Sequence, residues 1–295
     1  MEMISSVYEV SKEFMKNPQW VEIDYEQVYK IANAMISTGV SQFPRIPEKD
    51  RKDRSIISQE LVASSINYCY WYGKSTIRPN NSSSTKMYEL VEQSFSNYDP
   101  FSADTSFKAC VSRLTKRLAT NRFPLLEERV KHLTEVAMVG EHIVQEIHRG
   151  FINNQCKPET DGYRFVQPMI ELLPGFASDI FLKRLSLFFL QLYRKLGYYE
   201  SMMEYLPVPA DYQVPKMLKH FGCISYHPVL DAMVQNNDHI SKGSLKECEI
   251  RAATVIVCQE LQKETGWNIS DIDSWLWLRR KECNDPFHLT ITTDY

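Results

Sequence analysis

Residues 244–266 read SLKECEIRAATVIVCQELQKETG, and this stretch decides the fold class. Its apolar residues recur every three or four positions, the spacing that places side chains on one face of an α-helix. They are Leu245, Cys248, Ala252, Val255, Ile256 and Leu261. Gly266 follows them and suits a C-terminal cap, because glycine adopts a left-handed backbone conformation without steric cost. The pattern therefore predicts one long helix that ends at Gly266.

Other segments repeat this spacing and extend the prediction to the whole chain. Residues 26–36 and 125–147 each place their apolar side chains on one helical face, and Gly140 marks a point at which the second span can split. Residues 180–193 are very apolar and indicate a buried helix. Strand alternation is scarce, and Leu289–Thr293, rich in β-branched residues, is the best strand candidate. We therefore expect a mostly α-helical fold.

The organisation of the 295 residues suits one globular unit. Residues 43–53, 78–84 and 94–105 are polar or contain turn residues, and they are expected to form loops. None of them is long enough to require separate domains. We therefore predict a single unit over residues 1–295.

Composition narrows the partners and the compartment. The net charge is −3, which gives no basic field to hold a nucleic acid. The stretch 180–193 contains two cations and is too short to span a bilayer, so no membrane is expected. Seven cysteines without C-x-x-C spacing favour a reducing, cytoplasmic compartment over a disulfide framework.

Asp211 is the first candidate for chemistry. The preceding Pro207-Val208-Pro209-Ala210 is expected to be extended, because proline disfavours helix in the residue before it. Residues 212–221 can then form a short helix that ends at Gly222, with Asp211 at its N-cap. A capping role is the ordinary reading of this aspartate. The functional alternative is a carboxylate that faces a cleft and stabilises an electron-poor sugar carbon.

Asp273 also has two readings. Ser270-x-x-Asp273 before an apolar run resembles a capping box, with aspartate in place of glutamate. The alternative is that Asp273 accepts hydrogen bonds from an amino-bearing or cationic ligand. Trp275 and Trp277 are two residues apart and cannot both face the core from one helix face, so one of them is free to line a pocket.

Lys183 and Arg184 interrupt the apolar segment 180–193. Two adjacent cations are costly to bury, so they must reach solvent, an acid or an anionic ligand. One interpretation is that apolar stems lie along the helix while the charged heads reach solvent. The other is that Lys183 or Arg184 contacts a phosphate group.

Motifs for metal or nucleotide-cofactor chemistry are absent from the sequence. None of the seven histidines forms an H-x-x-x-H pair, and no cysteine–histidine set has zinc spacing. The sequence also lacks a G-x-S-x-G elbow, a Walker loop and a G-x-G-x-x-G fingerprint. We therefore expect neither a metal nor a cofactor.

Seven separate blocks, in conserved order, resemble the queuosine-salvage family, whose enzymes release queuine from queuosine 5′-phosphate. An eighth likeness, Ile66-Asn67-Tyr68-Cys69-Tyr70-Trp71, lies in the first half. The seven blocks are Phe123–Arg129, Leu173–Phe176, Phe181–Arg184, Ala210–Pro215, Glu249–Ala253, Asp273–Trp277 and Pro286–His288. The resemblance covers most of the chain from about Asn67 onward, and it implies a divergent N-terminal helical part at 1–65 and a family-like core at 66–295 within the single unit.

The resemblance implies a fold, an activity and a set of site residues. The fold is all-α and akin to helix-hairpin-helix DNA glycosylases, adapted to a mononucleotide. The activity is hydrolysis of an N-glycosidic bond, with Asp211 in the position of the catalytic carboxylate and Asp273 in that of the base-binding acid. The wider substrate-binding set is Lys183, Arg184, Asn67, Trp71, Pro209, Tyr212 and Ser274.

Some positions depart from the family pattern. The family places an aromatic residue where Pro209 stands, a tyrosine at Ser274 and an aspartate at Leu278, and it brings a histidine from the N-terminal region, whereas no histidine precedes His132 here. These departures leave two alternatives open. One is the same reaction on another purine nucleotide, and the other is a protein that binds queuine or a nucleotide with impaired catalysis. A helical DNA glycosylase is disfavoured, because no basic stripe is evident.

Overall fold

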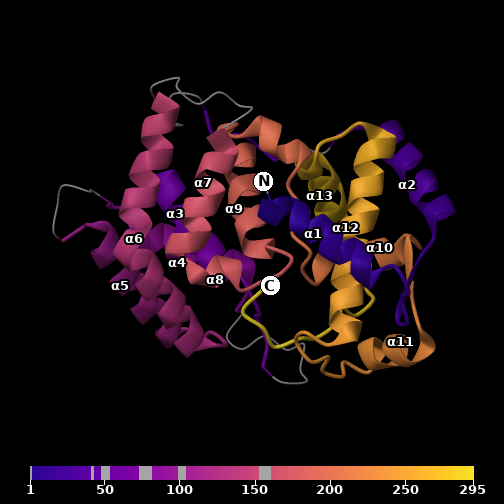
Figure 1. The fold of residues 1–295 in the computed structure, drawn as a ribbon. Helices are drawn as coiled ribbons and strands as arrows, with labels where there is room; N and C mark the ends of the chain where they lie inside the picture. Colours follow the sequence, from indigo (N-terminus) through magenta and orange to yellow (C-terminus); the bar gives the residue numbers. More distant parts are fainter. Residues whose placement is uncertain (1, 41–42, 48–53, 73–81, 99–103, 153–160) are drawn as a thin grey trace.

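A computed structural model describes residues 2–40, 43–47, 54–72, 82–98, 104–152 and 161–295. The helices lie in two groups joined through a central helix (Figure 1). The described part of the chain is mostly helical, with two short strands, so the predicted fold class is confirmed. The finer likeness to helix-hairpin-helix glycosylases and the single-unit organisation stay predictions. The buried hydrophobic side chains form one continuous cluster that runs from Ile4 to Tyr295.

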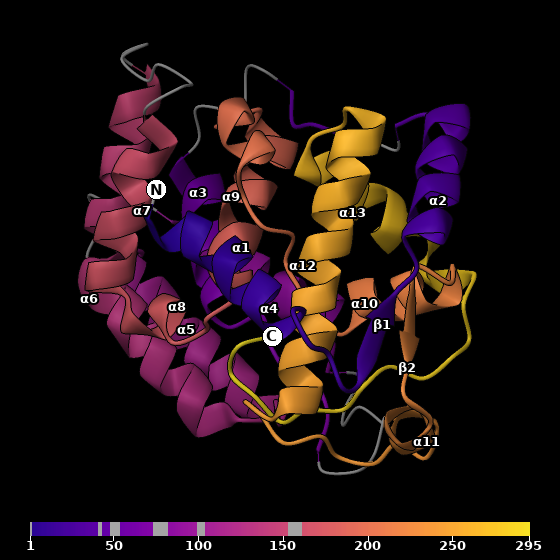
Figure 2. The same ribbon diagram turned by 45° about the vertical axis from the view of Figure 1, so that its right-hand side comes forward.

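The first group packs around a long helix, α6. It comprises α3 (Arg54–Ser65), α4 (Ser84–Phe95), α5 (Phe107–Thr120), α6 (Leu126–Ile152), α7 (Asp161–Leu172) and the short α8 (Pro174–Ala177). The helix α6 contacts α3, α5 and α7, while α4 packs against α3 and α5. Figures 1 and 2 both show this group on one side of the molecule.

The second group packs around α12 (Leu245–Thr265), the helix predicted from residues 244–266. It also contains α1 (Glu2–Phe14), α2 (Tyr25–Thr38), α10 (Gln213–His220), α11 (Pro228–Gln235), α13 (Ile269–Leu278) and the 3₁₀ turn η4 (Arg279–Lys281). The side chain of Ser244 accepts a hydrogen bond from Glu247 N, and Gly266 ends the helix at a φ of 69°. Because α12 contacts α1, α2, α10 and α13, it is buried on most sides (Figure 2).

The helix α9 (Lys183–Leu196) lies between the two groups, because it contacts α3 on one side and α13 on the other. A 3₁₀ turn, η3 (Glu200–Glu204), follows it and contacts α7 and α13. The apolar segment 180–193 thus forms the predicted buried helix. Its position brings side chains of α9 to the boundary between the helix groups, where the cavity described below lies.

The only strands in the described part of the chain are β1 (Val21–Ile23) and β2 (Ile224–Tyr226), paired antiparallel with Val21 opposite Tyr226. The prediction of a strand at Leu289–Thr293 is wrong. Leu289 forms one isolated bridge with His239 and accepts a hydrogen bond from Ile240 N at 2.8 Å. Its β-branched residues fit an extended segment packed on the core, but beyond this bridge it pairs with no strand among the residues that the structure describes.

Two glycines explain packing that their spacing did not reveal. The helix α6 runs through Gly140 without dividing. Gly140 instead leaves room for the Phe107 ring of α5, whose nearest atom would lie 2.7 Å from an added Cβ. At Gly175 an added Cβ would lie 2.7 Å from the His132 ring. Each glycine therefore serves a close contact between helices.

The six cysteines in the described residues, which exclude Cys156, are buried free thiols, in agreement with the absence of a disulfide framework. None of the helices that the structure describes combines the length and the apolar character needed to cross a membrane.

Candidate active site

A cavity of about 270 Å³ opens where α4, α9, α10 and α13 meet. It gathers segments that are far apart in the sequence, and it contains six of the nine predicted site residues. The predicted residues in its lining are Asn67, Lys183, Pro209, Asp211, Tyr212 and Asp273. The other lining residues include Phe43, Ser83, Ser84, Thr85, Tyr88, Leu187, Gln191, Arg194, Gln213, Trp277 and Arg280.

Asp211 combines a capping oxygen with an oxygen that has no partner among the described residues. Its Oδ1 accepts hydrogen bonds from Gln213 N at 2.7 Å and Val214 N at 3.3 Å, at the start of α10. The predicted capping role is therefore present, although the helix begins one residue later than expected. Oδ2 is left available in the cavity. Burial raises the pKa of Asp211, and the nearby Lys183 and the two N–H groups oppose this rise.

Lys183 lies at the first position of α9 and is only 3% exposed. Its Nζ donates a hydrogen bond to the backbone oxygen of Asn67 at 2.9 Å. Burial lowers the pKa of Lys183 to about 8, whereas the Asp211 carboxylate acts to raise it. A cation and a carboxylate thus interact electrostatically across the cavity. The cation is held by a neutral acceptor, which leaves part of its charge available to an anionic ligand.

Asp273 does not cap α13, so the capping-box prediction is wrong. The predicted box placed Ser270 at the N-cap, but the N-cap of α13 is Asn268, two residues earlier. The Asn268 side chain accepts a hydrogen bond from Asp271 N at 3.0 Å. Asp273 lies inside the helix, where its Oδ2 accepts a hydrogen bond from Arg194 Nη2 at 2.7 Å. This buried ion pair fixes one carboxylate oxygen and orients the group toward the cavity.

Ser274 belongs to the same polar cluster but lies outside the lining of the main cavity. Its hydroxyl accepts a hydrogen bond from Arg194 Nη2 at 2.8 Å and donates one to Ser270 O at 2.6 Å. Leu278 is also outside the lining and is 39% exposed. Of the three departures Pro209, Ser274 and Leu278, only Pro209 therefore contacts the cavity.

Aromatic side chains form part of the cavity wall. The rings of Phe43 and Trp277 lie 5.8 Å apart, and Tyr212 also lines the cavity. Trp71 lies behind Tyr212, with the two ring centroids 4.9 Å apart, and it is 1% exposed. Trp71 therefore supports the wall without lining it. Trp275 is buried and donates to Thr38 Oγ1, so the expectation that Trp275 and Trp277 face different surroundings is confirmed.

Arg184 points away from the cavity. Its guanidinium donates hydrogen bonds to the backbone oxygens of Ser65 and Gly175 and contacts His132 Nδ1 at 3.2 Å. Arg184 is 1% exposed and Lys183 is 3% exposed. Neither charged head therefore reaches solvent, which was the first of the two interpretations of this pair. Both are buried against backbone carbonyls instead. The surroundings of His132, buried and next to Arg184, lower its pKa to about 3.

Sequence reasoning missed Arg194 and the first turn of α4. Lys183, Leu187, Gln191 and Arg194 all line the cavity, and their spacing of four, four and three residues places them on one face of α9. That spacing was the available signal for Arg194. For α4 the signal was the serine run, because Ser83 caps the helix by accepting a hydrogen bond from Lys86 N.

One cluster of potential metal ligands occurs in the described residues. A ring nitrogen of His220, the thiol of Cys283 and a carboxylate oxygen of Asp285 lie within 4.8 Å of one another. None of these residues lines the cavity. The cavity itself offers two carboxylates and several nitrogen donors, a set suited to binding a polar organic molecule through hydrogen bonds.

Comparisons with known proteins place the chain in a family. The family model described as Queuosine salvage protein matches residues 47–293. A protein of Sphaerobacter thermophilus named queuosine 5′-phosphate N-glycosylase/hydrolase is 24% identical over 98% of this chain and 97% of its own length. Proteins of the same name from Dictyostelium discoideum and Mus musculus are 26% and 22% identical, over 80% and 95% of this chain and 77% and 88% of their own lengths. The matched region spans most of the sequence, and the chain therefore belongs to the queuosine salvage protein family.

Proposed function

We propose that this protein hydrolyses the N-glycosidic bond of queuosine 5′-phosphate and releases queuine. The names of its relatives supply the reaction and the substrate. The position of Asp211 is the observation that supports this reaction in the present chain. Asp211 lines the cavity, and one of its carboxylate oxygens has no partner among the described residues. The cavity would hold one small-molecule nucleotide.

Asp211 is proposed as the catalytic carboxylate. Cleavage of the bond between the sugar and the base builds positive charge on the sugar carbon, and an ionised carboxylate beside that carbon lowers the barrier. The α10 N–H groups hold Oδ1, so Oδ2 can face the sugar without a change in the cap. Lys183 and the N–H groups favour the ionised form against the effect of burial. These contacts favour a charged carboxylate in the cavity.

Asp273 is proposed to bind the base. Its Oδ2 is held by Arg194, and its other oxygen has no partner in the described part of the chain, so it can accept a hydrogen bond from an N–H group of the base. The rings of Phe43, Tyr212 and Trp277 give flat surfaces for the base within the same cavity. The family pattern has an aromatic residue where Pro209 stands, and in this cavity Phe43 and Trp277 supply aromatic surface instead.

Lys183 is proposed to contact the 5′-phosphate. Its ammonium group lines the cavity and is bonded to a neutral backbone oxygen, so a phosphate oxygen can share it. The first turn of α4 lines the same cavity with the hydroxyls of Ser83, Ser84 and Thr85. A helix N-terminus favours a bound anion, which supports a phosphate position near this turn. Arg184 is left out of this role because it faces the opposite side.

The test is release of free base from a panel of nucleotides. We expect the purified protein to release queuine from queuosine 5′-phosphate, as detected by mass spectrometry, and the Asp211→Asn variant to release almost none. The matched control is Asp24→Asn, because the Asp24 carboxylate also caps a helix, accepting a hydrogen bond from Gln27 N at the start of α2, but lies outside the cavity. Equal turnover in Asp211→Asn and Asp24→Asn would contradict the proposed role of Asp211.

A second substrate is favoured by one observation. Pro209 lines the cavity in the place where the family pattern has an aromatic residue, so the wall that faces the base differs. The panel should therefore include guanosine and adenosine 5′-phosphates beside queuosine 5′-phosphate. Faster release of guanine or adenine would assign the same chemistry to another purine nucleotide, and binding of queuine without any turnover would identify a non-catalytic binding protein.

A further inference from the structure

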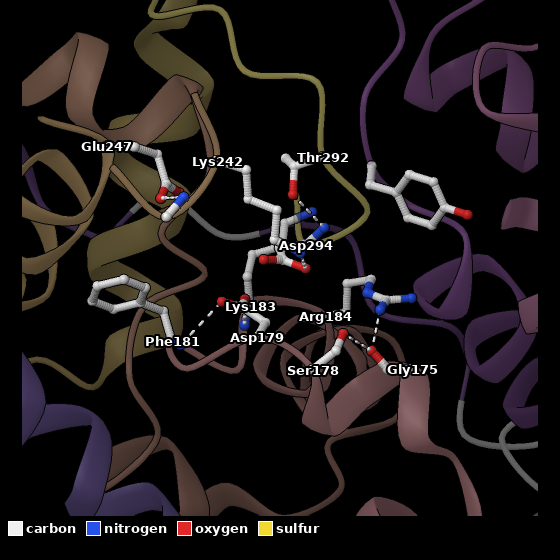
Figure 3. A network of polar contacts seen from close by, with 12 residues as sticks. Gly175, Ser178, Asp179, Phe181, Lys183, Arg184, Lys242, Glu247, Thr292 and Asp294 are labelled. Atoms are coloured by element: carbon white, nitrogen blue, oxygen red, sulfur yellow. Dashed lines mark hydrogen bonds and ion pairs between the residues drawn. The ribbon is translucent and has the colours of Figure 1, made fainter. Parts of the chain in front are cut away.

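Two helices that carry cavity residues begin in the same way. Asp179 accepts hydrogen bonds from Phe181 N at 3.0 Å and from Lys183 N at 2.8 Å, so its carboxylate caps α9 just as Asp211 caps α10. Figure 3 shows Asp179 beside Phe181 and Lys183. The cap is needed, because Leu182, at the N-cap position, has a left-handed backbone with a φ of 52° and no side-chain oxygen to offer.

Arg251, on α12, joins these two helix starts. Its Nη1 and Nη2 donate to the two carboxylate oxygens of Asp179 at 2.8 and 2.7 Å, which is a bidentate ion pair. Its Nε donates to the backbone oxygen of Ala210 at 2.9 Å, one residue before Asp211. A single guanidinium thus contacts the cap of the helix that begins with Lys183 and the residue next to Asp211. We call these contacts the Arg251 bridge.

The Arg251 bridge is enclosed and rigid. Arg251 and Asp179 are each 1% exposed. The guanidinium lies over the ring of Phe181 at 4.4 Å and over the ring of Tyr295 at 4.5 Å, and Glu247 adds a second acid at 3.4 Å. Each of the three guanidinium nitrogens donates to a protein acceptor, and Arg251 does not line the cavity, so the group is not placed to bind substrate. Its effect on the reaction must pass through the segments that it holds.

We propose that Arg251 is a positioning residue that sets the separation of Lys183 and Asp211 through its bonds to Asp179 and Ala210. The inference rests on the proposed function, because it concerns the phosphate contact and the catalytic carboxylate assigned there. Lysine cannot replace arginine in this place, since an ammonium group is a point donor and cannot hold both carboxylate oxygens and a carbonyl in one plane. The requirement is geometric rather than one of charge alone.

The first experiment uses Arg251→Lys, which keeps the charge and removes the planar contacts. The matched control is Glu249→Gln, because Glu249 is a buried residue of the same helix whose carboxylate accepts hydrogen bonds from Gln19 N, Trp20 N and Val21 N, outside the cavity. We expect kcat of Arg251→Lys to fall by about 100-fold, since misplacement of reacting groups by about 1 Å has this cost. KM for the nucleotide should rise as well, because Lys183 is displaced from the phosphate, and Glu249→Gln should retain the kcat and KM of the unsubstituted protein even if it melts at a lower temperature.

A second variant keeps the test decisive if Arg251→Lys does not fold. The double variant Asp179→Asn with Arg251→Gln is neutral and retains hydrogen-bonding groups at both positions, and we expect it to lose kcat to a similar extent. Loss of kcat in proportion to the fall in melting temperature, equally for these variants and Glu249→Gln, would overturn the inference. So would an unchanged kcat in a folded Arg251→Lys or in the double variant.

A readout without turnover separates this inference from the proposed function. Lys183 is buried, so trace acetylation of its amine by acetic anhydride, followed by peptide mass spectrometry, should be slow in the unsubstituted protein. We expect acetylation of Lys183 to become several-fold faster in Arg251→Lys and to stay slow in Glu249→Gln. If no nucleotide is hydrolysed but this difference appears, the proposed function fails and the Arg251 bridge stands. Equal acetylation rates in both variants would overturn the bridge whatever the activity.

Discussion

Asp179 and Asp211 perform the same local task in opposite electrostatic settings. Each carboxylate accepts hydrogen bonds from two N–H groups at a helix start. Burial acts to raise the pKa of Asp179, but its ion pair with Arg251 lowers it below the ordinary value. Burial raises the pKa of Asp211, and there the opposing Lys183 is too weakly coupled to reverse the effect. The same capping contact thus belongs to a structural ion pair at Asp179, whereas at Asp211 it leaves a carboxylate that can react.

The pairing of the oxygens explains this difference. Both oxygens of Asp179 bind Arg251, and the residue is fully enclosed, so the carboxylate has nothing left to offer a ligand. Asp211 uses one oxygen for the cap and turns the other toward the cavity. A fully compensated buried charge is costly to break because its partner is left uncompensated, whereas a partly compensated charge that lines a cavity can act on a substrate.

The largest effect is expected from Asp211→Asn. Base release should fall by about 1,000-fold or more, because loss of a positioned electrostatic contact to the transition state has costs of this order. The folded state should be as stable or more so, since asparagine caps a helix as well as aspartate and removes a carboxylate whose raised pKa means that its ionised form destabilises the fold at neutral pH. Thermal melting beside turnover measures both; a large drop in melting temperature would contradict the comparison.

Asp179→Asn should show the opposite pattern in stability. Removal of one partner from a buried ion pair costs about 3–5 kcal/mol, because Arg251 is left with an uncompensated charge. The pKa of Asp179 is lowered in the folded state, so its contribution is fully present at neutral pH and is lost only as the pH falls below its unfolded value of about 3.9. Urea unfolding at pH 7 gives the number. A change no larger than that of the exposed cap variant Asp24→Asn would refute the assignment.

Lys183→Ala should sharpen the proposed phosphate contact. A charge-assisted hydrogen bond contributes about 1.5–3 kcal/mol, so kcat/KM for queuosine 5′-phosphate should fall by about 10–100-fold more than kcat/KM for the free nucleoside. The measured quantity is the loss in kcat/KM for the nucleotide divided by the loss for the nucleoside. An effect of the substitution on the Asp211 carboxylate changes both losses equally and cancels in this ratio. Equal losses on nucleotide and nucleoside would show that Lys183 acts without contacting phosphate.

The smallest effect is expected in the pH dependence. Asp211 acts when ionised, so activity should rise with pH through a pKa above the ordinary aspartate value. Lys183 acts when protonated, so activity should fall again as the pH passes about 8. In Lys183→Arg the alkaline fall should disappear from this range, because arginine stays protonated. A fall near pH 8 that persists in Lys183→Arg would assign it to another group.

The sequence predicted the helices and six of the residues that line the cavity, for identifiable reasons. Local spacing and caps reveal helices such as α12, and the ordered blocks pointed to Asp211 and Asp273, which do meet at one cavity. The partners of these residues could not be predicted in the same way. Arg194 pairs with Asp273 across 79 positions, and Arg251 pairs with Asp179 across 72. Such contacts depend on how helices pack, which no local pattern contains.

The misread residues have the same cause. Asp273 fitted a capping box because the true cap, Asn268, lies only two residues before Ser270. Neither Lys183 nor Arg184 reaches solvent, which was one interpretation of this pair. Both are buried against backbone carbonyls supplied by distant segments, and of the two only Lys183 also lines the cavity. The spacing of residues around a lysine or arginine does not show whether distant backbone carbonyls will surround it.

Hydrolysis in H₂¹⁸O tests the central claim most directly. The protein is incubated with queuosine 5′-phosphate in labelled water, and both products are weighed by mass spectrometry. We expect unlabelled queuine together with ribose 5-phosphate, because water replaces the base at the sugar carbon and not at a carbon of the base. The label in ribose 5-phosphate does not decide, since its anomeric oxygen exchanges with water. Labelled queuine, inorganic phosphate with intact nucleoside, or no free queuine at all would contradict cleavage of the glycosidic bond.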